Sequence, residues 1–223
     1  MNKNRCVVMF ARYPEAGKVK SRLIPCMGEE KTALLYRCFV NDLIDMLDGG
    51  PFSFRIAVTP AEKRAEMASC FGDGPVYMPQ KGVDLGERMK GAFIDCFEAG
   101  IASVLVIGSD LPDLPRHVIE KGFTVLDVYE SVIGPSRDGG YYLIGFRRET
   151  FSPDVFDGIA WGTGTVYEKT MEALTCRKSR VFRLPLQRDI DRPDDLEHFF
   201  RRSSRAGRVD SRTMHYLVQE KIF

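Results

Sequence analysis

Short apolar runs alternate along this chain with longer segments whose apolar residues recur at helical spacing. The runs 6–11 and 103–108 are almost entirely apolar, which is typical of strands buried on both faces of a sheet. Between them, the segment 29–47 has helical spacing, and the paired glycines 49–50 predict its end. Further strands are predicted at 52–58, 76–78, 131–134, 141–146 and 180–184, and further helices at 60–70, 85–99, 115–128, 165–174, 193–201 and 213–222.

This alternation of strands and helices predicts an α/β fold. Strands that alternate with helices build a mostly parallel sheet with helices on both faces, so we expect three layers, α/β/α. No repeat or linker divides the 223 residues, and this length suits one domain. We therefore predict a single domain over 1–223, with a long loop at 12–28, an irregular stretch near 147–163 and a C-terminal helical appendix at 200–223.

Composition and charge argue against several classes of partner. Lys and Arg number 32 against 31 Asp and Glu, a net charge of +1, which gives no support to binding of nucleic acid or of an anionic membrane surface. No apolar run approaches the ~20 residues of a membrane span, and the first residues lack the long apolar region of a signal peptide. The six cysteines form no C-x-x-C pair, as is typical of reduced thiols. We expect a cytoplasmic protein without stable membrane insertion.

Candidate chemistry is sought directly after the strands, because ligands of open α/β sheets bind outside the carboxyl ends of the strands. The segment 12–22 follows the first strand and groups Lys18, Lys20 and Arg22, with Gly17 available for a close backbone approach. Lysine and arginine side chains in such a group suit a polyphosphate. The alternative is a solvated basic loop, and the Walker pattern of P-loop proteins is absent.

Carboxylates follow two other predicted strands. Asp110 comes directly after the strand 103–108, where an oxygen ligand for Mg²⁺ or Mn²⁺ is expected. Asp189 and Asp191 follow the strand 180–184 and are candidates for a second ligand that meets Asp110. The alternative for each carboxylate is helix capping, since acidic residues favour helix N-termini.

Glycines and a single tryptophan mark a further region. Asp138, Gly139 and Gly140 lie between two predicted strands and form either a hairpin turn or a place where the backbone approaches a sugar or phosphate. In the second case Asp138 would accept hydrogen bonds from hydroxyl groups. Trp161, the only tryptophan, either packs on a ligand or anchors a loop.

Two polar segments have structural explanations. Asp84 stands three residues before Glu87, the spacing of a capping box at a helix start. The arginines of 201–212 predict a solvated face, with a phosphate or partner site as the alternative.

These segments, in this order, resemble a bacterial family of GT-A-type transferases, the rSAM-associated transferase type, described as nucleotide-diphospho-sugar transferases. More distantly, the chain is similar to the guanylyltransferases of molybdenum-cofactor and phospholactate metabolism. The resemblance runs from about residue 5 to 200 and implies a Rossmann-like GT-A fold. It is carried by residues 10–12, 17–23, 84–89, 108–112, 134–145 and 189–191.

The resemblance implies a role for each matching residue. The nucleotide and its phosphates would be bound by Ala11, Arg12, Gly17, Lys18, Lys20, Arg22 and Asp84. The divalent metal would be bound by Asp110 and Asp191. The acceptor or sugar would face Asp138, Gly139, Gly140 and Tyr141, and we add Trp161 from its position. Two departures are plain: one carboxylate, in 109–111, replaces the Asp-x-Asp of glycosyltransferases, and 10–14 replaces the glycine-rich start of guanylyltransferases.

The leading hypothesis is an enzyme, a transferase that uses Mg²⁺ or Mn²⁺ and a nucleotide-activated donor. The family description favours a nucleotide-diphospho-sugar (glycosyl) transferase. The alternative, favoured by a second carboxylate at Asp191, is a nucleotidyltransferase that joins a nucleoside triphosphate to a phosphorylated acceptor and releases pyrophosphate. In both, Lys20 and Arg22 would stabilise phosphate charge and Asp138 would orient the acceptor. A non-catalytic nucleotide- or sugar-phosphate-binding module is a second alternative.

Overall fold

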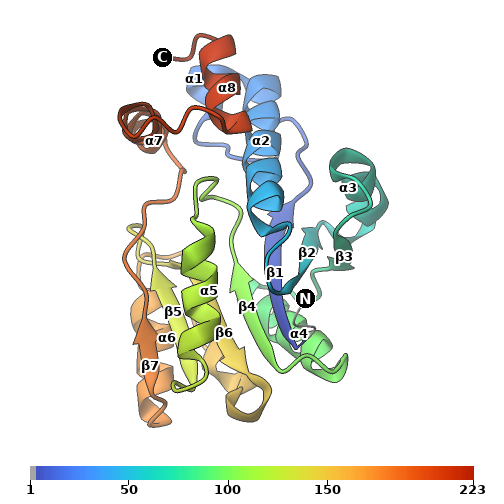
Figure 1. Cartoon of the computed structure of the whole chain (residues 1–223), viewed down its shortest axis with the longest axis vertical. Helices are drawn as coiled ribbons and strands as arrows, with labels where there is room; N and C mark the ends of the chain where they lie inside the picture. The colour runs from blue at the N-terminus through green and yellow to red at the C-terminus, as the bar shows by residue number, and fades with distance from the viewer. Residues whose placement is uncertain (1–3) are drawn as a thin grey trace.

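One seven-stranded sheet organises the protein, in the order β3-β2-β1-β4-β6-β5-β7 (Figure 1). The computed structural model describes residues 4–223, so the first three residues of the predicted domain lie outside it. β6 is antiparallel to β4 and β5, and the other neighbouring pairs are parallel. The strands are β1 (Arg5–Arg12), β2 (Ser53–Thr59), β3 (Val76–Pro79), β4 (Ser103–Ile107), β5 (Ser131–Pro135), β6 (Tyr141–Arg147) and β7 (Val181–Arg183).

Helices cover both faces of this sheet (Figure 1). Alternate residues of β1 explain why: Val7 and Met9 join one buried cluster, and Val8 and Phe10 join the other. Because both faces of β1 are apolar, both must be covered, which confirms the predicted three-layer α/β arrangement. The first cluster takes in α2 (Glu29–Leu47), α3 (Arg64–Phe71), α5 (Arg116–Val125), α7 (Pro193–Arg205) and α8 (Arg212–Gln219), and the second takes in α4 (Leu85–Glu98) and α6 (Val166–Cys176).

The register of β1 and β4 fixes where the following loops begin. Met9 is paired with Ile107 in parallel register, so the loops that follow β1 and β4 leave the sheet at the same edge. β1 lies between β2 and β4. The chain that leaves β1 continues to β2 on one side, whereas the chain that leaves β4 continues to β5 on the other side. Such a switch point opens a crevice at the carboxyl ends of the strands.

Several predicted elements differ from the structure in extent. The predicted loop 12–28 contains a short helix, α1 (Ile24–Met27), which Pro25 permits because it stands in the first turn. The irregular stretch 147–163 contains the 3₁₀ turns Arg148–Thr150 and Pro153–Phe156; the second buries Phe156 in the core. The predicted helix 60–70 opens as a 3₁₀ turn at Ala61–Lys63. α7 extends to Arg205, so residue 200 lies inside that helix.

Asp84 begins α4 as its spacing predicts. Its side chain accepts a hydrogen bond from the backbone N–H of Glu87 at 2.8 Å. The reciprocal bond of the capping box is shifted by one residue, because the Glu87 carboxylate accepts from the N–H of Val83 at 2.9 Å. This arrangement fixes the first turn of α4, which faces the crevice.

The C-terminal helix α8 packs against α2. The buried carboxylate of Asp42 in α2 accepts hydrogen bonds from the backbone N–H groups of Arg212 (2.7 Å) and Thr213 (3.0 Å). Leu217 of α8 is fully buried in the same core. Across residues 4–223, none of the helices combines the length and apolar character that crossing a membrane requires.

Candidate functional site

Two cavities open at the carboxyl ends of the strands. The first, of about 590 Å³, lies beside the loop after β1, and the second, of about 840 Å³, lies beside the β5–β6 turn. They are contiguous because six residues line both: Phe10, Arg22, Leu85, Ser109, Asp110 and Asp191.

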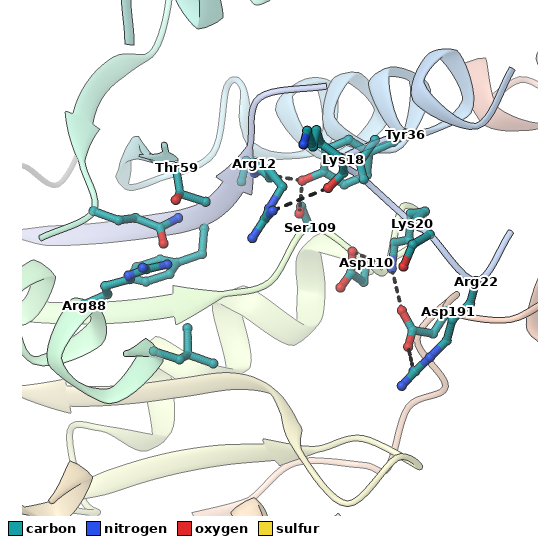
Figure 2. Close-up of a pocket in the computed structure, with 16 residues that line it drawn as sticks. Arg12, Lys18, Lys20, Arg22, Tyr36, Thr59, Arg88, Ser109, Asp110 and Asp191 are labelled. Atoms are coloured by element: carbon teal, nitrogen blue, oxygen red, sulfur yellow. Dashed lines mark hydrogen bonds and ion pairs between the residues drawn. The ribbon is translucent and has the colours of Figure 1, made fainter. Parts of the chain in front are cut away.

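A cluster of four charged side chains occupies the boundary between the cavities (Figure 2). The ammonium of Lys20 lies 2.7 Å from Oδ1 of Asp110 and 3.2 Å from Oδ1 of Asp191. The guanidinium of Arg22 pairs with Oδ2 of Asp191. The cluster therefore joins the loop after β1 to the ends of two other segments of the chain.

Backbone contacts bring these segments together. The N–H of Ile190 donates to the carbonyl oxygen of Asp110 at 2.9 Å, which places the segment before α7 alongside the end of β4. Lys20 adopts a φ of 46°, an uncommon conformation for a residue with a Cβ. Its carbonyl accepts from the N–H of Leu23 at 2.8 Å in a tight turn. The fold thus holds Lys20 in a left-handed conformation at the cluster.

Burial and neighbouring charges shift the pKa values of Lys20 and Asp189. Burial acts to lower the pKa of Lys20, but the neighbouring carboxylates of Asp110 and Asp191 outweigh it, and the pKa is raised overall. Lys20 is therefore a permanent cation in this environment. Burial, followed by the charge of Asp138, raises the pKa of Asp189 to about 6. The second cavity thus contains a carboxyl group that titrates well above its ordinary range.

A hydrogen-bonded tyrosine supports the floor of the first cavity. The hydroxyl of Tyr36, which comes from α2, accepts from the backbone N–H of Arg12 at 3.0 Å. It also lies 2.7 Å from Oγ of Ser109, the residue before Asp110. Burial raises the pKa of Tyr36, so the hydroxyl stays neutral. The side chain ties the ends of β1 and β4 together.

The turn between β5 and β6 forms one wall of the second cavity. Oδ1 of Asp138 accepts hydrogen bonds from the hydroxyl of Ser136 and from the backbone N–H of Gly140, the latter at 2.9 Å. Gly139, with a φ of 87°, packs against the backbone of Gly164 so closely that a Cβ would overlap it. The turn therefore supports the loop that carries Trp161.

Trp161 reaches across to the start of α4. A Cβ on Gly86 would lie 2.6 Å from Cε2 of the indole, so only glycine fits beneath the ring. The ring also lies 6.3 Å, between centroids, from that of Phe156 in the core. Trp161 is thus a loop anchor that also lines the second cavity, while its packing on a ligand stays a prediction.

Arginines as well as aspartates line the second cavity. Its lining includes Arg22, Arg137, Arg188 and Arg192. Arg188 is paired with Asp195 at 2.6 Å, and the N–H of Arg192 donates to the same carboxylate at 2.8 Å. Over residues 4–223 no ion pair involves Arg137, so its guanidinium is available to an anion.

Most of the predicted site residues line these cavities. The first is lined by Ala11, Arg12, Lys18, Lys20, Arg22, Asp110 and Asp191. The second is lined by Asp110, Asp138, Gly140, Tyr141, Trp161 and Asp191. Gly17, Asp84 and Gly139 line neither cavity. Gly17 is placed against the carboxylate of Glu29, while Asp84 caps α4.

Sequence reasoning missed further lining residues. In the first cavity these are Tyr36, Thr59, Gln80 and Arg88. Thr59 and Gln80 directly follow or end strands, so the rule that selected Asp110 also selects them. In the second cavity the missed residues are Arg137, Arg188, Arg192 and Asp195. Their positions depend on the packing of 187–192 beside the β5–β6 turn, which no local pattern indicates.

The carboxylates at the boundary suit a hard divalent cation. Asp110 and Asp191 already share one cation, the ammonium of Lys20, and they offer the oxygen ligands that Mg²⁺ and Mn²⁺ prefer. Within residues 4–223, no three Asp, Glu, His or Cys side chains are grouped to hold a metal. An ion here would therefore need water or substrate oxygens as well, which is usual for Mg²⁺.

Comparison with known proteins agrees with the motif resemblance. A family model described as "Uncharacterized protein conserved in bacteria (DUF2064)" matches residues 44–163. A solved structure from Desulfovibrio desulfuricans G20, provisionally described as a nucleotide-diphospho-sugar transferase, is 38% identical, with a TM-score of 0.95 over 98% of this chain and 96% of that one. These two matches confirm the family resemblance drawn from the motifs.

Two more distant matches extend the comparison. The 3-phospho-D-glycerate guanylyltransferase of Phenylobacterium zucineum (strain HLK1) is 27% identical over 186 residues, which cover 79% of this chain and 81% of that protein. Rv0371c from Mycobacterium tuberculosis H37Rv, solved in complex with manganese, is 12% identical, with a TM-score of 0.54 over 88% of this chain and 97% of that one. The second match shows a shared fold alone.

Proposed function

This chain belongs to the bacterial family DUF2064, and we propose that it is a metal-dependent nucleotidyltransferase. It would join the nucleoside monophosphate part of a nucleoside triphosphate to a phosphorylated acceptor and release pyrophosphate. The observation that carries the proposal is the charged cluster of Lys20, Arg22, Asp110 and Asp191 at the boundary of the two cavities. A reaction between two substrates, one in each cavity, would take place there.

The chemistry of phosphoryl transfer matches this position. An oxygen of the acceptor phosphate forms a bond to the α-phosphorus, and the bond from the α-phosphorus to the bridging oxygen of pyrophosphate breaks. Negative charge develops on the pyrophosphate as it leaves. Lys20 and Arg22 would stabilise that charge, and catalysis of this kind depends mainly on positioning and electrostatics.

A divalent metal completes the proposed site. Asp110 and Asp191 would hold Mg²⁺ or Mn²⁺, and the ion, when bound, neutralises phosphate charge and orients the triphosphate. A protein with the same fold has been solved in complex with manganese, which makes a divalent metal a reasonable candidate here. The first cavity, with Arg12 and Lys18 in its wall, would hold the nucleotide.

The second cavity is lined by both arginines and aspartates, and we propose that its arginines, Arg137 first, bind an anionic acceptor. Its lining includes Arg137, Arg188 and Arg192, and arginine forks match phosphate and carboxylate geometry. The similarity to a 3-phospho-D-glycerate guanylyltransferase supports a small phosphorylated acid as acceptor, and supports GTP as donor. Asp138 would position the acceptor by fixing the turn through its hydrogen bonds with Ser136 and Gly140.

Glycosyl transfer from a nucleotide sugar is the second candidate. It is supported by the 38% identity to a protein provisionally described as a nucleotide-diphospho-sugar transferase. In that reaction the reacting carbon lies beyond both phosphates, so the catalytic carboxylate must face the sugar. Oδ1 of Asp138, the carboxylate best placed for this, already accepts two hydrogen bonds within its own turn. We favour nucleotidyl transfer because the paired carboxylates Asp110 and Asp191 lie beside the cations Lys20 and Arg22, where phosphates would bind.

Product identity separates the two reactions. We would incubate the protein with Mg²⁺ or Mn²⁺, each nucleoside triphosphate or nucleotide sugar, and a panel of small phosphorylated acids that includes 3-phospho-D-glycerate. Nucleotidyl transfer releases pyrophosphate, and glycosyl transfer releases a nucleoside diphosphate. Release of nucleoside diphosphate alone would replace our proposal with the second candidate.

A pair of variants tests whether the chain is an enzyme at all. Asp110→Asn keeps the size of the side chain but removes a metal ligand, so turnover should fall on the order of 10²–10³-fold or more. Asp73→Asn, an exposed residue outside both cavities, is the matched control and should retain full turnover. No turnover with any donor, together with metal-independent nucleotide affinity in Asp110→Asn, would identify a binding module instead.

A further inference from the structure

We infer that Lys20 is an internal cation that occupies the metal site in the metal-free protein and must leave it before a metal binds. The nucleotide then provides the place to which Lys20 moves, so metal and nucleotide bind together rather than metal first. The inference rests on the proposed function, because it concerns the same carboxylates, Asp110 and Asp191. It adds a control over metal binding that the reaction itself does not require.

The first observation is the enclosure of the ammonium. The side chain of Lys20 is 5% exposed, whereas those of Asp110 and Asp191 are 44% and 33% exposed. All three residues line the first cavity, and the ammonium of Lys20 lies 2.7 Å from the carboxylate of Asp110 and 3.2 Å from that of Asp191. A buried ammonium is costly unless it is paired, so these two contacts hold it in place. An incoming metal would compete with it for the same oxygen atoms.

The second observation is the charge balance. The cluster contains two carboxylates and two cations, because Arg22 pairs with the remaining oxygen of Asp191. A divalent ion added to this neutral cluster would face two positive groups at close range. A triphosphate brings several negative charges, to which Lys20 and Arg22 can turn. The metal is therefore repelled when alone and accepted when it arrives with phosphate.

The third observation is the backbone at Lys20. A residue with a Cβ rarely adopts a φ of 46°, and such conformations persist where the surrounding structure imposes them. Here the turn from Lys20 to Leu23 fixes the backbone. The flexible four-carbon side chain is thus the part that is free to exchange carboxylates for phosphates.

Lys18 provides an internal comparison. It lines the same cavity two residues earlier, but its side chain is exposed. In residues 4–223 no carboxylate forms an ion pair with it. A variant at Lys18 removes a positive charge from the same cavity without vacating the metal site. It separates competition for ligands from a general change in electrostatic potential.

The test measures the binding of MnCl₂ alone, by isothermal titration calorimetry and by the electron paramagnetic resonance of free Mn²⁺. Lys20→Met should bind Mn²⁺ at least tenfold more tightly than the unmodified protein. Lys18→Met should bind it with less than a threefold change. Lys20→Arg keeps the cation and should resemble the unmodified protein. Thermal melts check folding, and Lys20→Gln replaces Lys20→Met if the latter does not fold.

The second arm uses inorganic tripolyphosphate with Mn²⁺ as a base-independent ligand. By linkage, if phosphate releases Lys20 from the carboxylates, the two ligands favour each other's binding. This mutual gain should be large in the unmodified protein and reduced at least tenfold in Lys20→Met. An equal mutual gain in the unmodified protein and in Lys20→Met would contradict the proposed movement of Lys20 from the carboxylates to the phosphates.

The outcomes distinguish failure of the inference about Lys20 from failure of the proposed metal site. If Lys20→Met and Lys20→Gln gain no affinity for Mn²⁺, whether or not the unmodified protein binds the ion, the inference about Lys20 is wrong. In the double variant Lys20→Met/Asp110→Asn the gain should disappear. If the gain persists there, Mn²⁺ binds elsewhere, and the proposed metal site fails together with the inference.

Discussion

Substitution of Gly139 by alanine tests how the turn between β5 and β6 positions the second cavity. Gly139 has a φ of 87°, and its backbone packs directly on that of Gly164. A Cβ at this position would lie 2.6 Å from the carbonyl carbon of Gly164 and 2.7 Å from its Cα. Because the obstacle is backbone rather than a flexible side chain, the loop that carries Trp161 has to move.

The expected cost has two parts. A Cβ in the left-handed region costs about 1–2 kcal/mol. Nonbonded carbon atoms prefer separations of about 3.5–4.0 Å, so the loop must shift on the order of 1 Å. Overpacking of this kind adds about 1–3 kcal/mol. Gly139→Ala should therefore destabilise the protein by about 2–5 kcal/mol.

Gly158 provides the matched control. It has a φ of 71°, but among the described residues 4–223 no atom beyond its two chain neighbours lies within 4 Å of the Cβ position. Gly158→Ala therefore carries the backbone cost alone, about 1–2 kcal/mol. The difference between the two variants in urea denaturation isolates the steric contribution.

Trp161 reports the displacement directly, because it is the only tryptophan. In Gly139→Ala the loop should move away from Gly86, so the emission of Trp161 should shift to longer wavelength. In Gly158→Ala the emission should stay unchanged. Under the proposed function, the KM for the acceptor should rise while the affinity for the nucleotide, in the first cavity, is retained. Equal destabilisation by the two variants, with unchanged emission, would refute this account of the turn.

Three further predictions concern the support of the site. Tyr36→Phe leaves the backbone N–H of Arg12 without its acceptor and should cost about 1–3 kcal/mol in urea denaturation; an unchanged midpoint would contradict the role of the hydroxyl. The pKa of Asp189, raised to about 6 from 3.8, means that its protonated form stabilises the fold; this contribution is complete below pH 3.8 and lost as pH rises through about 6. The stability of Asp189→Asn relative to the unmodified protein should therefore increase between pH 4 and 7, and a pH-independent difference would argue against it. Asp42→Ala removes the acceptor for the N–H groups at the start of α8 and should cost about 1–3 kcal/mol; amide exchange of Thr213 should accelerate while nucleotide affinity is unchanged.

The fold was largely predictable because its elements carry strong local signals. The apolar run that forms β1 and the amphipathic pattern of α2 give both their type and their position along the chain. Weak signals explain the misses. The four-residue helix α1 is too short for periodicity, and the 3₁₀ turn that buries Phe156 belongs to a class of element that apolar spacing does not distinguish from a loop.

The site was predictable only to the level of segments. Position after a strand selected Asp110, and the cationic loop was evident from its residue types. The ion-pair partners of the cations were not predictable, because nothing in the sequence indicates that Lys20 contacts the carboxylates of both Asp110 and Asp191. Asp84 shows how one residue can carry two predictions: its spacing predicted the cap, which its bond to the N–H of Glu87 confirms, whereas its proposed part in nucleotide binding stays a prediction.

The topology explains why the family match leaves the chemistry open. Residues 44–163 include Asp110 and Asp138 but exclude both the loop with Lys20 and the segment with Asp191. These two outer segments lie 171 residues apart in the chain and meet only because β1 is beside β4 and the backbone of Ile190 is bonded to that of Asp110. A relative that keeps the matched core but changes either outer segment would keep the fold and one carboxylate, yet lose the paired cation site. The proposed metal site therefore depends on the contact of these two outer segments with Asp110, and substitutions of Lys20 or Asp191, like those of Asp110, should alter the proposed reaction without altering the fold.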